Sequence, residues 1–317
     1  MSANWSKQAE RGGKMAYWGM KFMLAAYRVG GRPLFALILY PVLFWFFVFS
    51  RAARAASRDY LLRLSRNAPE LQLQPSLYLS WRHFLAFADM VLDKFRAWAA
   101  QVTIHDVHAH GCEMMHHRLD SGEGGILLTS HLGNIEAMQA IATRDSTRSI
   151  INTELSSVNA ALRLNVLMHT KHAAQFNRLL DAQGKSRSLR LIQVEDLNAA
   201  LAADLAQRVA SGEWLVIAAD RVPPHNARTL TVDFLGAAAA LPLGPHLLGM
   251  IMQCPMVLAL CVKQADGLHV FFETLSEAQV VARSERTVWQ QQSAQRYADR
   301  LAHYCRLAPL QWFNFYS

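Results

Sequence analysis

The chain is poor in cysteine and lacks the motifs that cysteine and histidine commonly build in metal sites. Its 317 residues include 4 cysteines, which lie far apart and in mainly apolar surroundings. Paired Cys-x-x-Cys and helical His-Glu-x-x-His patterns are both missing. We therefore expect the cysteines to be reduced core residues of a protein in a cytosolic compartment. They are Cys112, Cys254, Cys261 and Cys305.

One histidine-rich stretch still has to be weighed as a metal site. Residues 105–117 contain His105, His108, His110, Cys112, His116 and His117. Zinc needs three or four ligands that converge at defined spacings, and this stretch does not offer them. We expect a solvated, histidine-rich edge and no metal.

Other absences narrow the class of protein. A Gly-x-Ser-x-Gly elbow is missing, which argues against a hydrolase with a covalent intermediate. No zinc-finger, RNA-recognition or helix-turn-helix signature accompanies the excess of 32 Lys and Arg over 24 Asp and Glu. A basic chain without such signatures is suited to anionic lipid or to acidic proteins, so we expect no nucleic-acid partner. We find no internal repeat and no low-complexity linker, and we expect no cleavable signal peptide.

Residues 1–74 are predicted to form a basic, aromatic, membrane-associated region. Residues 33–50 carry no charge, and their length is at the lower limit for crossing a bilayer. Basic residues flank this run on both sides, and Pro41 interrupts it. Spanning would carry the preceding cations across the membrane against the positive-inside tendency. We expect a helix in the cytoplasmic leaflet with both ends in the cytoplasm, and a buried core helix is the alternative.

Residues 75–317 are predicted to form one α/β domain. Apolar runs such as 126–128 and 214–219 are typical of strands covered on both faces, and helical segments separate them. Alternating strands and helices predict a mixed, largely parallel central sheet flanked by helices. We also expect a helix over residues 156–167 and another that Asp196 caps.

The stretch 126–136 organises this domain. It is predicted to be a strand, a tight turn and the start of a helix for which Asn134 is a suitable N-cap. His131 then lies at the carboxyl end of the strand, where open α/β sheets bind their ligands. Glu136 lies in the first helical turn, and the turn between them can bring the two side chains together.

A histidine beside a carboxylate can act as a general base. His131 would take the proton of a hydroxyl as its oxygen attacks a carbonyl, while Glu136 holds the tautomer and stabilises the imidazolium. Two simpler interpretations stay open. Glu136 can serve only to complement the helix dipole, and His131 can be an ordinary polar loop residue.

The segment Ser130-His131-Leu132-Gly133-Asn134-Ile135-Glu136 resembles the first motif of the lysophospholipid acyltransferase superfamily. It is most similar to the branch of lipid A late acyltransferases, which transfer lauroyl or myristoyl groups and have Glu where the glycerolipid enzymes have Asp. Further stretches resemble this branch in the same order along the chain. They are His83–Asp89, Asp220–Arg221, Asp233–Gly236, Pro242–Pro245 and Pro309–Phe315.

Some of these residues can also be interpreted directly. Arg221 offers a rigid fork for a phosphate or carboxylate, or it forms a structural pair with Asp220 or Asp233. Gly236 and Gly244 let the backbone approach a ligand closely, or they simply make turns.

The resemblance implies an acyltransferase in which His131 and Glu136 are catalytic. A fatty acyl group would pass from a thioester of acyl carrier protein, or of CoA, to a hydroxyl of a lipid A-like membrane acceptor. No acyl-enzyme, cofactor or metal is expected, and the location implied is the cytoplasmic face of the bacterial inner membrane. The substrate-binding residues that the resemblance implies are Asn134, Asp220, Arg221, Phe234, Gly236 and Gly244.

Two alternatives to this function stay open. One is acylation of a different acceptor, such as another lipid head group or a polyketide-like chain on a carrier. The other is a membrane scaffold that kept the fold and lost turnover. The chain departs from the family pattern between residues 152 and 187 and at Pro223–Pro224, which bears on the acceptor more than on the chemistry.

Overall fold

The computed structural model describes residues 13–98, 106–134, 162–168, 189–223 and 228–315. The described α-helices are α2 (Gly13–Phe49), α3 (Arg51–Asn67), α4 (Leu77–Trp98), α5 (Cys112–Asp120), α9 (Ala199–Ala210), α10 (Leu243–Met252) and α11 (Arg286–Leu307). The strands are β1 (Val107–His110), β2 (Gly125–Thr129), β3 (Leu164–Met168), β4 (Leu189–Gln193), β5 (Trp214–Ala218), β6 (Thr229–Phe234), β7 (Ala237–Pro242), β8 (Met256–Gln264) and β9 (Gly267–Ser276). Two 3-10 turns, η1 (Pro69–Leu71) and η3 (Val194–Asp196), complete the described elements.

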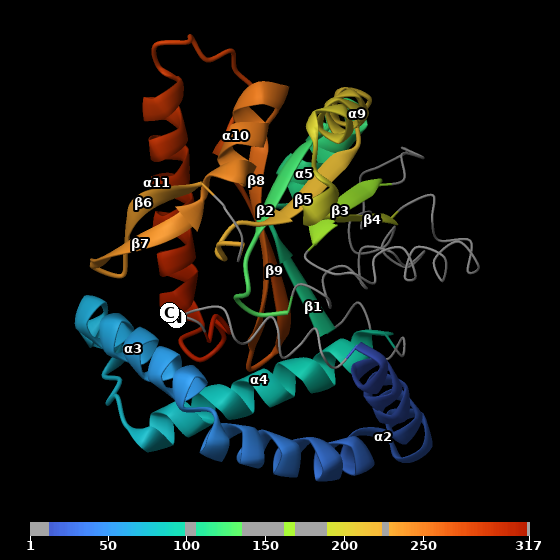
Figure 1. The fold of residues 1–317 in the computed structure, drawn as a ribbon, viewed down its shortest axis with the longest axis vertical. Coiled ribbons are helices and arrows are strands. Elements are labelled where there is room, and N and C mark those ends of the chain that lie inside the picture. The colour runs from blue at the N-terminus through green and yellow to red at the C-terminus, as the bar shows by residue number, and fades with distance from the viewer. Residues whose placement is uncertain (1–12, 99–105, 135–161, 169–188, 224–227, 316–317) are drawn as a thin grey trace.

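A seven-stranded sheet in the order β1-β9-β8-β2-β5-β3-β4 forms the centre of the molecule (Figure 1). Five strands, from β8 to β4 in that order, run parallel to one another. The β8–β9 pair is antiparallel, so β9 and its parallel neighbour β1 run the other way. The structure confirms the predicted mixed, largely parallel sheet with flanking helices.

The strands are apolar along their length because both faces of the sheet are covered. Successive residues of β2 point to opposite faces, so Ile126 and Leu128 join one buried cluster and Leu127 joins another. The first cluster includes residues of α9, α10 and α11, and the second includes Met115 of α5. The β6–β7 hairpin packs beside α11, where Gln295 bonds both backbone groups of Asp233.

The N-terminal helices lie across one end of the sheet (Figure 1). Helix α2 is bent at Gly31, whose φ of 59° and ψ of −153° are not helical. Its second half packs Phe47 against Trp81 and Phe84 of α4. Within the described part of the chain, no single helix is long and apolar enough to cross a membrane. The pair Pro33–Phe49 and Arg51–Asn67, bent by 87°, passes that test together, on length and composition only.

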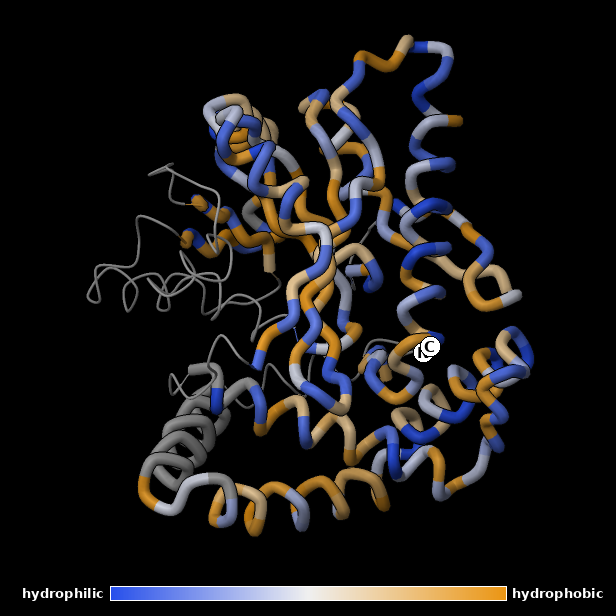
Figure 2. The backbone as a smooth tube through the Cα atoms, turned by 180° about the vertical axis from the view of Figure 1, so that it is seen from behind, coloured by the Kyte–Doolittle hydropathy of each residue, from blue (hydrophilic) through white to orange (hydrophobic). Residues whose placement is uncertain are grey.

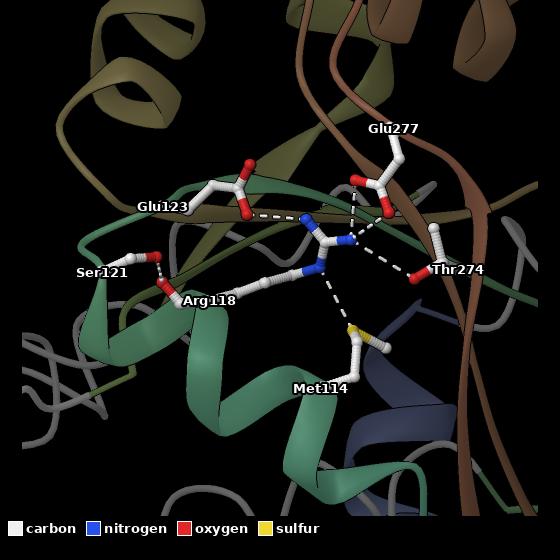
Figure 3. Close-up of polar contacts among 6 residues, drawn as sticks. All are labelled: Met114, Arg118, Ser121, Glu123, Thr274 and Glu277. Carbon is white, nitrogen blue, oxygen red and sulfur yellow. Dashed lines mark hydrogen bonds and ion pairs between the residues drawn. The ribbon is translucent and has the colours of Figure 1, made fainter.

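At the opposite end of the sheet, buried Arg118 joins three segments (Figure 3). Its guanidinium donates to Glu123, which precedes β2, at 2.6 Å and to Glu277, which follows β9, at 2.7 and 2.8 Å. It also donates to Thr274 at 3.3 Å and lies 3.1 Å from the sulfur of Met114. This cluster connects α5 to the end of the sheet that lies away from His131.

Two expectations about secondary structure were wrong. Residues 164–168 form strand β3 and not the end of a helix, because they pair with both β4 and β5 inside the sheet. The cap of α9 is Asn198, whose side chain accepts from the backbone N–H of Leu201 at 2.9 Å, and not Asp196, which ends the preceding 3-10 turn. The predicted helix after Asn134, with Glu136, lies outside the described residues.

Candidate active site

His131 lies two residues beyond Thr129, the last residue of β2, and the backbone around it is tightly constrained. The Ser130 hydroxyl accepts from the N–H of Leu132 at 3.0 Å, and the N–H of Asn134 donates to the carbonyl of Cys261 at 2.7 Å. Gly133 has a φ of 73°. A Cβ at Gly133 would lie 1.9 Å from the Cys261 carbonyl oxygen, so the turn needs glycine. These contacts fix the position of the backbone that carries the His131 imidazole.

Asp220 holds the imidazole of His131 from the neighbouring strand. Because β2 and β5 are parallel and pair Thr129 with Ala218, the residues that follow each strand meet at the same end of the sheet. Asp220 Oδ1 lies 2.8 Å from His131 Nδ1, and Asp220 Oδ2 accepts from the backbone N–H of His131 at 2.8 Å. One carboxylate therefore orients both the ring and the backbone of His131.

The C-terminal strap, residues 309–315, crosses this end of the sheet and contacts both His131 and Asp220. The indole N–H of Trp312 donates to Asp220 Oδ2 at 3.0 Å, and the Asn314 amide donates to the Asp220 carbonyl at 3.2 Å. The N–H of Phe313 donates to the carbonyl of His131 at 2.9 Å. The strap thus fixes the carboxylate in the geometry that meets the ring.

Burial and hydrogen bonding have opposite effects on Asp220. Its side chain is 0% exposed, and burial alone would raise the pKa of the carboxyl. The neighbouring His131 charge and the hydrogen bonds from His131 and Trp312 outweigh burial and hold the pKa of Asp220 below its ordinary value. An ionised Asp220 accepts the proton of Nδ1, which assigns the neutral ring the tautomer with a lone pair on Nε2.

The His131 side chain is partly exposed at this end of the sheet. Its side chain is 35% exposed, and within the described part of the chain no group bonds to Nε2. A partly exposed ring with one nitrogen held by a buried carboxylate and a lone pair on the other nitrogen can take a proton from a substrate. The described cluster of three possible metal ligands lies elsewhere, on β1, the β8–β9 turn and β9.

A second layer of side chains supports the strap. The Nε2–H of His83 donates to the carbonyl of Trp312 at 2.9 Å, and Nδ1 of His83 lies 3.0 Å from the Ser57 hydroxyl. Burial lowers the pKa of His83 to about 4, so this ring is neutral at pH 7. The rings of Tyr60 and Phe234 both meet the Trp312 indole edge-on, at 5.0 and 5.1 Å between centroids.

The predicted site residues divide by position. Asp220 meets His131, and its buried side chain offers a substrate no surface. Arg221 is half-buried and directly follows it. Asn134 is buried and its amide donates to the carbonyl of Met90 in α4 at 3.1 Å. Glu136 lies outside the described residues, so its place as the partner of His131 stays a prediction.

The other three predicted residues belong to the hairpin and α10. Phe234 is buried against Trp312, at the end of β6. Leu235 and Gly236, with φ of 54° and 72°, form the two-residue β6–β7 turn, which favours glycine. Gly244 is exposed in the first turn of α10, and a Cβ there would meet no atom within 4 Å. Substrate contact by these residues stays a prediction.

Sequence reasoning gave no role to Trp312, Asn314 or His83. Each lies in a stretch that resembled the acyltransferase family, at residues 309–315 and 83–89. That resemblance was the available signal. Nothing in the local pattern shows that Trp312 bonds the carboxylate of Asp220, 92 residues away, or that Asn314 bonds the Asp220 backbone carbonyl. Nor does it show that His83 bonds the carbonyl of Trp312.

A mixed sheet with polar side chains gathered at the carboxyl ends of its parallel strands is the architecture of an α/β enzyme. Comparison with protein families makes this specific. The model of the family described as bacterial lipid A biosynthesis acyltransferase matches residues 83–317. The chain belongs to this family and is an acyltransferase. No curated protein matches its sequence.

Proposed function

We propose that the chain moves a fatty acyl group from an acyl-carrier-protein or CoA thioester to a hydroxyl of a lipid A-like membrane acceptor. Membership of the acyltransferase family supports the reaction class. The observation that supports His131 as the base is its geometry: Asp220 lies 2.8 Å from Nδ1, and the ring is 35% exposed. An acidic carrier protein suits the formal charge of +8.

The proposed mechanism is direct transfer with general-base catalysis. His131 Nε2 takes the hydroxyl proton as the acceptor oxygen attacks the thioester carbonyl. The tetrahedral intermediate collapses, the carbon–sulfur bond breaks, and the thiolate leaves with the proton from the imidazolium. An ester forms, a thioester is consumed, and the thiol carries away the acceptor's proton. The ionised Asp220 stabilises the imidazolium between these two steps.

Two carboxylates are candidates for the partner of His131. Glu136 enters the proposal from sequence alone, while the support for Asp220 is its contact with Nδ1. We propose that Asp220 is a positioning residue and that Glu136 adds a second acidic group to the catalytic site. Comparing the turnover of Asp220→Asn with that of Glu136→Gln shows which carboxylate the base His131 depends on. A shift of the pH–rate profile without loss of folding marks the orienting carboxylate.

The remaining predicted residues are proposed to contact substrate. Arg221 would bind an anionic group of the donor or acceptor through its planar guanidinium, and Gly244 leaves room for a ligand beside the first turn of α10. Asn134, Phe234 and Gly236 would form part of the wall of the substrate site. Arg221→Lys should raise the Michaelis constant, because Lys cannot reproduce a bidentate fork. A fall in melting temperature with an unchanged Michaelis constant would favour a structural ion pair instead.

The central experiment measures thiol release by the full chain in detergent, with acyl carrier protein or CoA thioesters as donors. His131→Ala should reduce turnover about a hundredfold or more, and it should keep its melting temperature. The exposed His117 on α5 supplies the matched control, because His117→Ala removes a histidine away from Asp220. Near-normal turnover by folded His131→Ala would refute the mechanism. Mass spectrometry of total lipids with and without the gene identifies the acceptor.

We also propose that the N-terminal region associates with the cytoplasmic leaflet of the inner membrane. Part of the segment 33–49 packs on α4, and several of its large apolar side chains are exposed. Figure 2 shows that this segment is largely hydrophobic. Its exposed residues include Leu37, Val42, Phe44, Trp45 and Phe49. A pocket lined by Arg51, Arg54 and Arg58 adjoins it. Apolar side chains beside cations suit the boundary between acyl chains and anionic head groups.

Vesicle flotation and cysteine labelling test this membrane proposal. Trp45→Glu should weaken binding to anionic vesicles, whereas Val280→Glu, in an exposed position of the β9–α11 loop, should not. An engineered Ser2→Cys should resist an impermeant thiol reagent added from the periplasmic side of intact cells. Ready labelling would show a spanning segment, and recovery in the soluble fraction without detergent would refute association with the membrane.

A further inference from the structure

A group of polar side chains lies at the edge of the sheet, on strands that do not carry His131. His108 of β1, Asp266 of the β8–β9 turn and His269 of β9 each offer a ligand atom, and these atoms lie within 4.8 Å of one another. In the strand order, β9 and β8 separate β1 from β2, so the group is distinct from the His131–Asp220 pair. None of these residues has a part in the proposed acyl transfer.

The distances among the three residues are close to those of a coordination shell. Asp266 Oδ1 lies 2.9 Å from His269 Nε2, and Asp266 Oδ2 lies 3.6 Å from His108 Nε2. A tetrahedral zinc ion with bonds of about 2.0–2.1 Å separates its ligand atoms by ~3.3 Å. The observed distances, each to a different oxygen of Asp266, fall on either side of that value, and all three ligand atoms lie within 4.8 Å of one another. Rotation of the two exposed side chains, His108 and Asp266, would bring the three atoms onto one ion.

The backbone brings these residues together from distant parts of the sequence. Parallel pairing of β1 with β9 sets His108 directly opposite His269, and their rings stack 4.7 Å apart. The β8–β9 turn then has to approach the start of β1. A Cβ at Gly267 would lie 2.6 Å from the carbonyl oxygen of Asp106, so the approach needs glycine, and Asp266 comes to lie beside the Nε2 atoms of both rings.

His110 supplies the support that metal-binding histidines usually have. Its Nε2 lies 3.0 Å from Nδ1 of His269, so it can accept the Nδ1–H and leave the Nε2 lone pair of His269 facing Asp266. A hydrogen bond of this kind to the far nitrogen fixes the tautomer of a metal-bound histidine. The ring of His110 is itself held against Phe271, with 4.4 Å between centroids.

We propose that His108, His269 and Asp266 bind one divalent transition-metal ion of the zinc class. Two imidazole nitrogens and a carboxylate oxygen are ligands that zinc accepts, and water would complete the shell, because His108 and Asp266 are exposed. Hard cations such as Mg²⁺ prefer oxygen ligands and should not compete. The bound ion would join the edge strand β1 to the β8–β9 hairpin. This departs from the expectation from sequence, which considered residues 105–117 without Asp266 or His269.

The test is a Zn²⁺ titration of the full chain in detergent, purified without a polyhistidine tag and stripped of metal by a chelator. A chromogenic indicator that competes for Zn²⁺ reports the affinity. The wild-type chain should bind one equivalent. His108→Ala and Asp266→Asn should each weaken binding by about tenfold or more, and His110→Ala should weaken it by roughly tenfold through the loss of support. His269 is buried, so we avoid it as a first variant.

The control variant is His117→Ala, which lies in the same histidine-rich stretch but on α5. It should bind Zn²⁺ as the wild type does. Zn²⁺ at a large excess over its dissociation constant should raise the melting temperature of the wild type and of His117→Ala by about 3 °C or more, and that of His108→Ala much less. Absence of saturable binding, or equal affinity in the wild type and His108→Ala, would overturn the proposal.

Discussion

The two ends of the central sheet each bury a charged side chain, but the two groups are satisfied differently. At one end Arg118 donates to two carboxylates and a hydroxyl, which connects α5 to the ends of the strands (Figure 3). At the other end Asp220 accepts from His131 and Trp312. Both networks include residues distant in sequence, and both lie where loops meet the sheet.

The difference lies in what each network leaves available to a substrate. The Arg118 guanidinium is enclosed, and its contacts with Glu277 and Glu123 outweigh burial and raise its pKa. The Asp220 network ends on an imidazole that is 35% exposed. An enclosed, fully bonded charge stabilises a fold, whereas a bonded charge that holds a half-exposed base in place supports a reaction. The comparison predicts that changes at one end alter stability and changes at the other alter turnover.

Asp220→Asn should produce the largest effect. Two N–H donors, from His131 and Trp312, point at Oδ2 and would hold the amide oxygen there. The amide NH₂ would then face Nδ1 of His131 and force the ring proton onto Nε2, which abolishes the base. We expect turnover at neutral pH to fall by about a thousandfold. Steady-state kinetics checks this, and turnover within a few fold of wild type would contradict it.

Acid should weaken the protein through His83, which supports the catalytic end, and through His246. Burial lowers the pKa of both to about 4, from 6.5 in the unfolded chain. The unfolded state therefore takes up protons first as the pH falls below 6.5, and the stability is full above that pH and is lost towards pH 4. Each histidine should contribute roughly 3 kcal/mol to this loss.

Urea unfolding at several pH values between 7.5 and 4 measures this dependence. His83→Gln keeps a donor for the Trp312 carbonyl without titrating, so it should clearly reduce the slope of unfolding free energy against pH. His246→Gln should remove a similar share from a position between α10 and α11, where His246 lies 2.9 Å from Ser293. An unchanged slope in His83→Gln would contradict the assignment.

Arg118→Met should lower stability and leave the kinetics unchanged. Met keeps much of the buried stem but loses the hydrogen bonds to Glu123 and Glu277. Those carboxylates are partly exposed, so water can solvate them. We therefore expect the free energy of unfolding to fall by about 2 kcal/mol, less than when a buried charge is left unpaired. Thermal unfolding and steady-state kinetics are measured together. A changed Michaelis constant would break the contrast between the two ends.

Trp312→Phe should have the smallest effect, and it sharpens the comparison within the catalytic end. It removes the indole N–H bond to Asp220 while keeping a ring for Tyr60 and Phe234 to pack against. Asp220 keeps its two bonds to His131, so we expect turnover to fall by about tenfold with little change in melting temperature. An effect as large as that of Asp220→Asn would mean that the strap has a further role.

The local pattern of the chain determined much of the fold. Buried strands β2 and β5 were predictable because their apolar runs are bounded by glycine and polar residues, and this placed His131 at a strand end. Short apolar runs do not separate strand from helix by periodicity, which is why β3 was wrongly expected to be helical. The position of His131 and the family resemblance were thus available from sequence, as was the class of enzyme.

Tertiary structure alone decided which groups meet. His131 and Asp220 lie 89 residues apart in sequence and come together because β2 and β5 pair in parallel and finish at the same end of the sheet. Trp312 reaches the same carboxylate from the C-terminal strap, and Asp266 reaches His108 through the β8–β9 turn. A local pattern specifies the period and ends of an element, but the partner of a side chain depends on strand order and register. These are set by packing of the whole sheet.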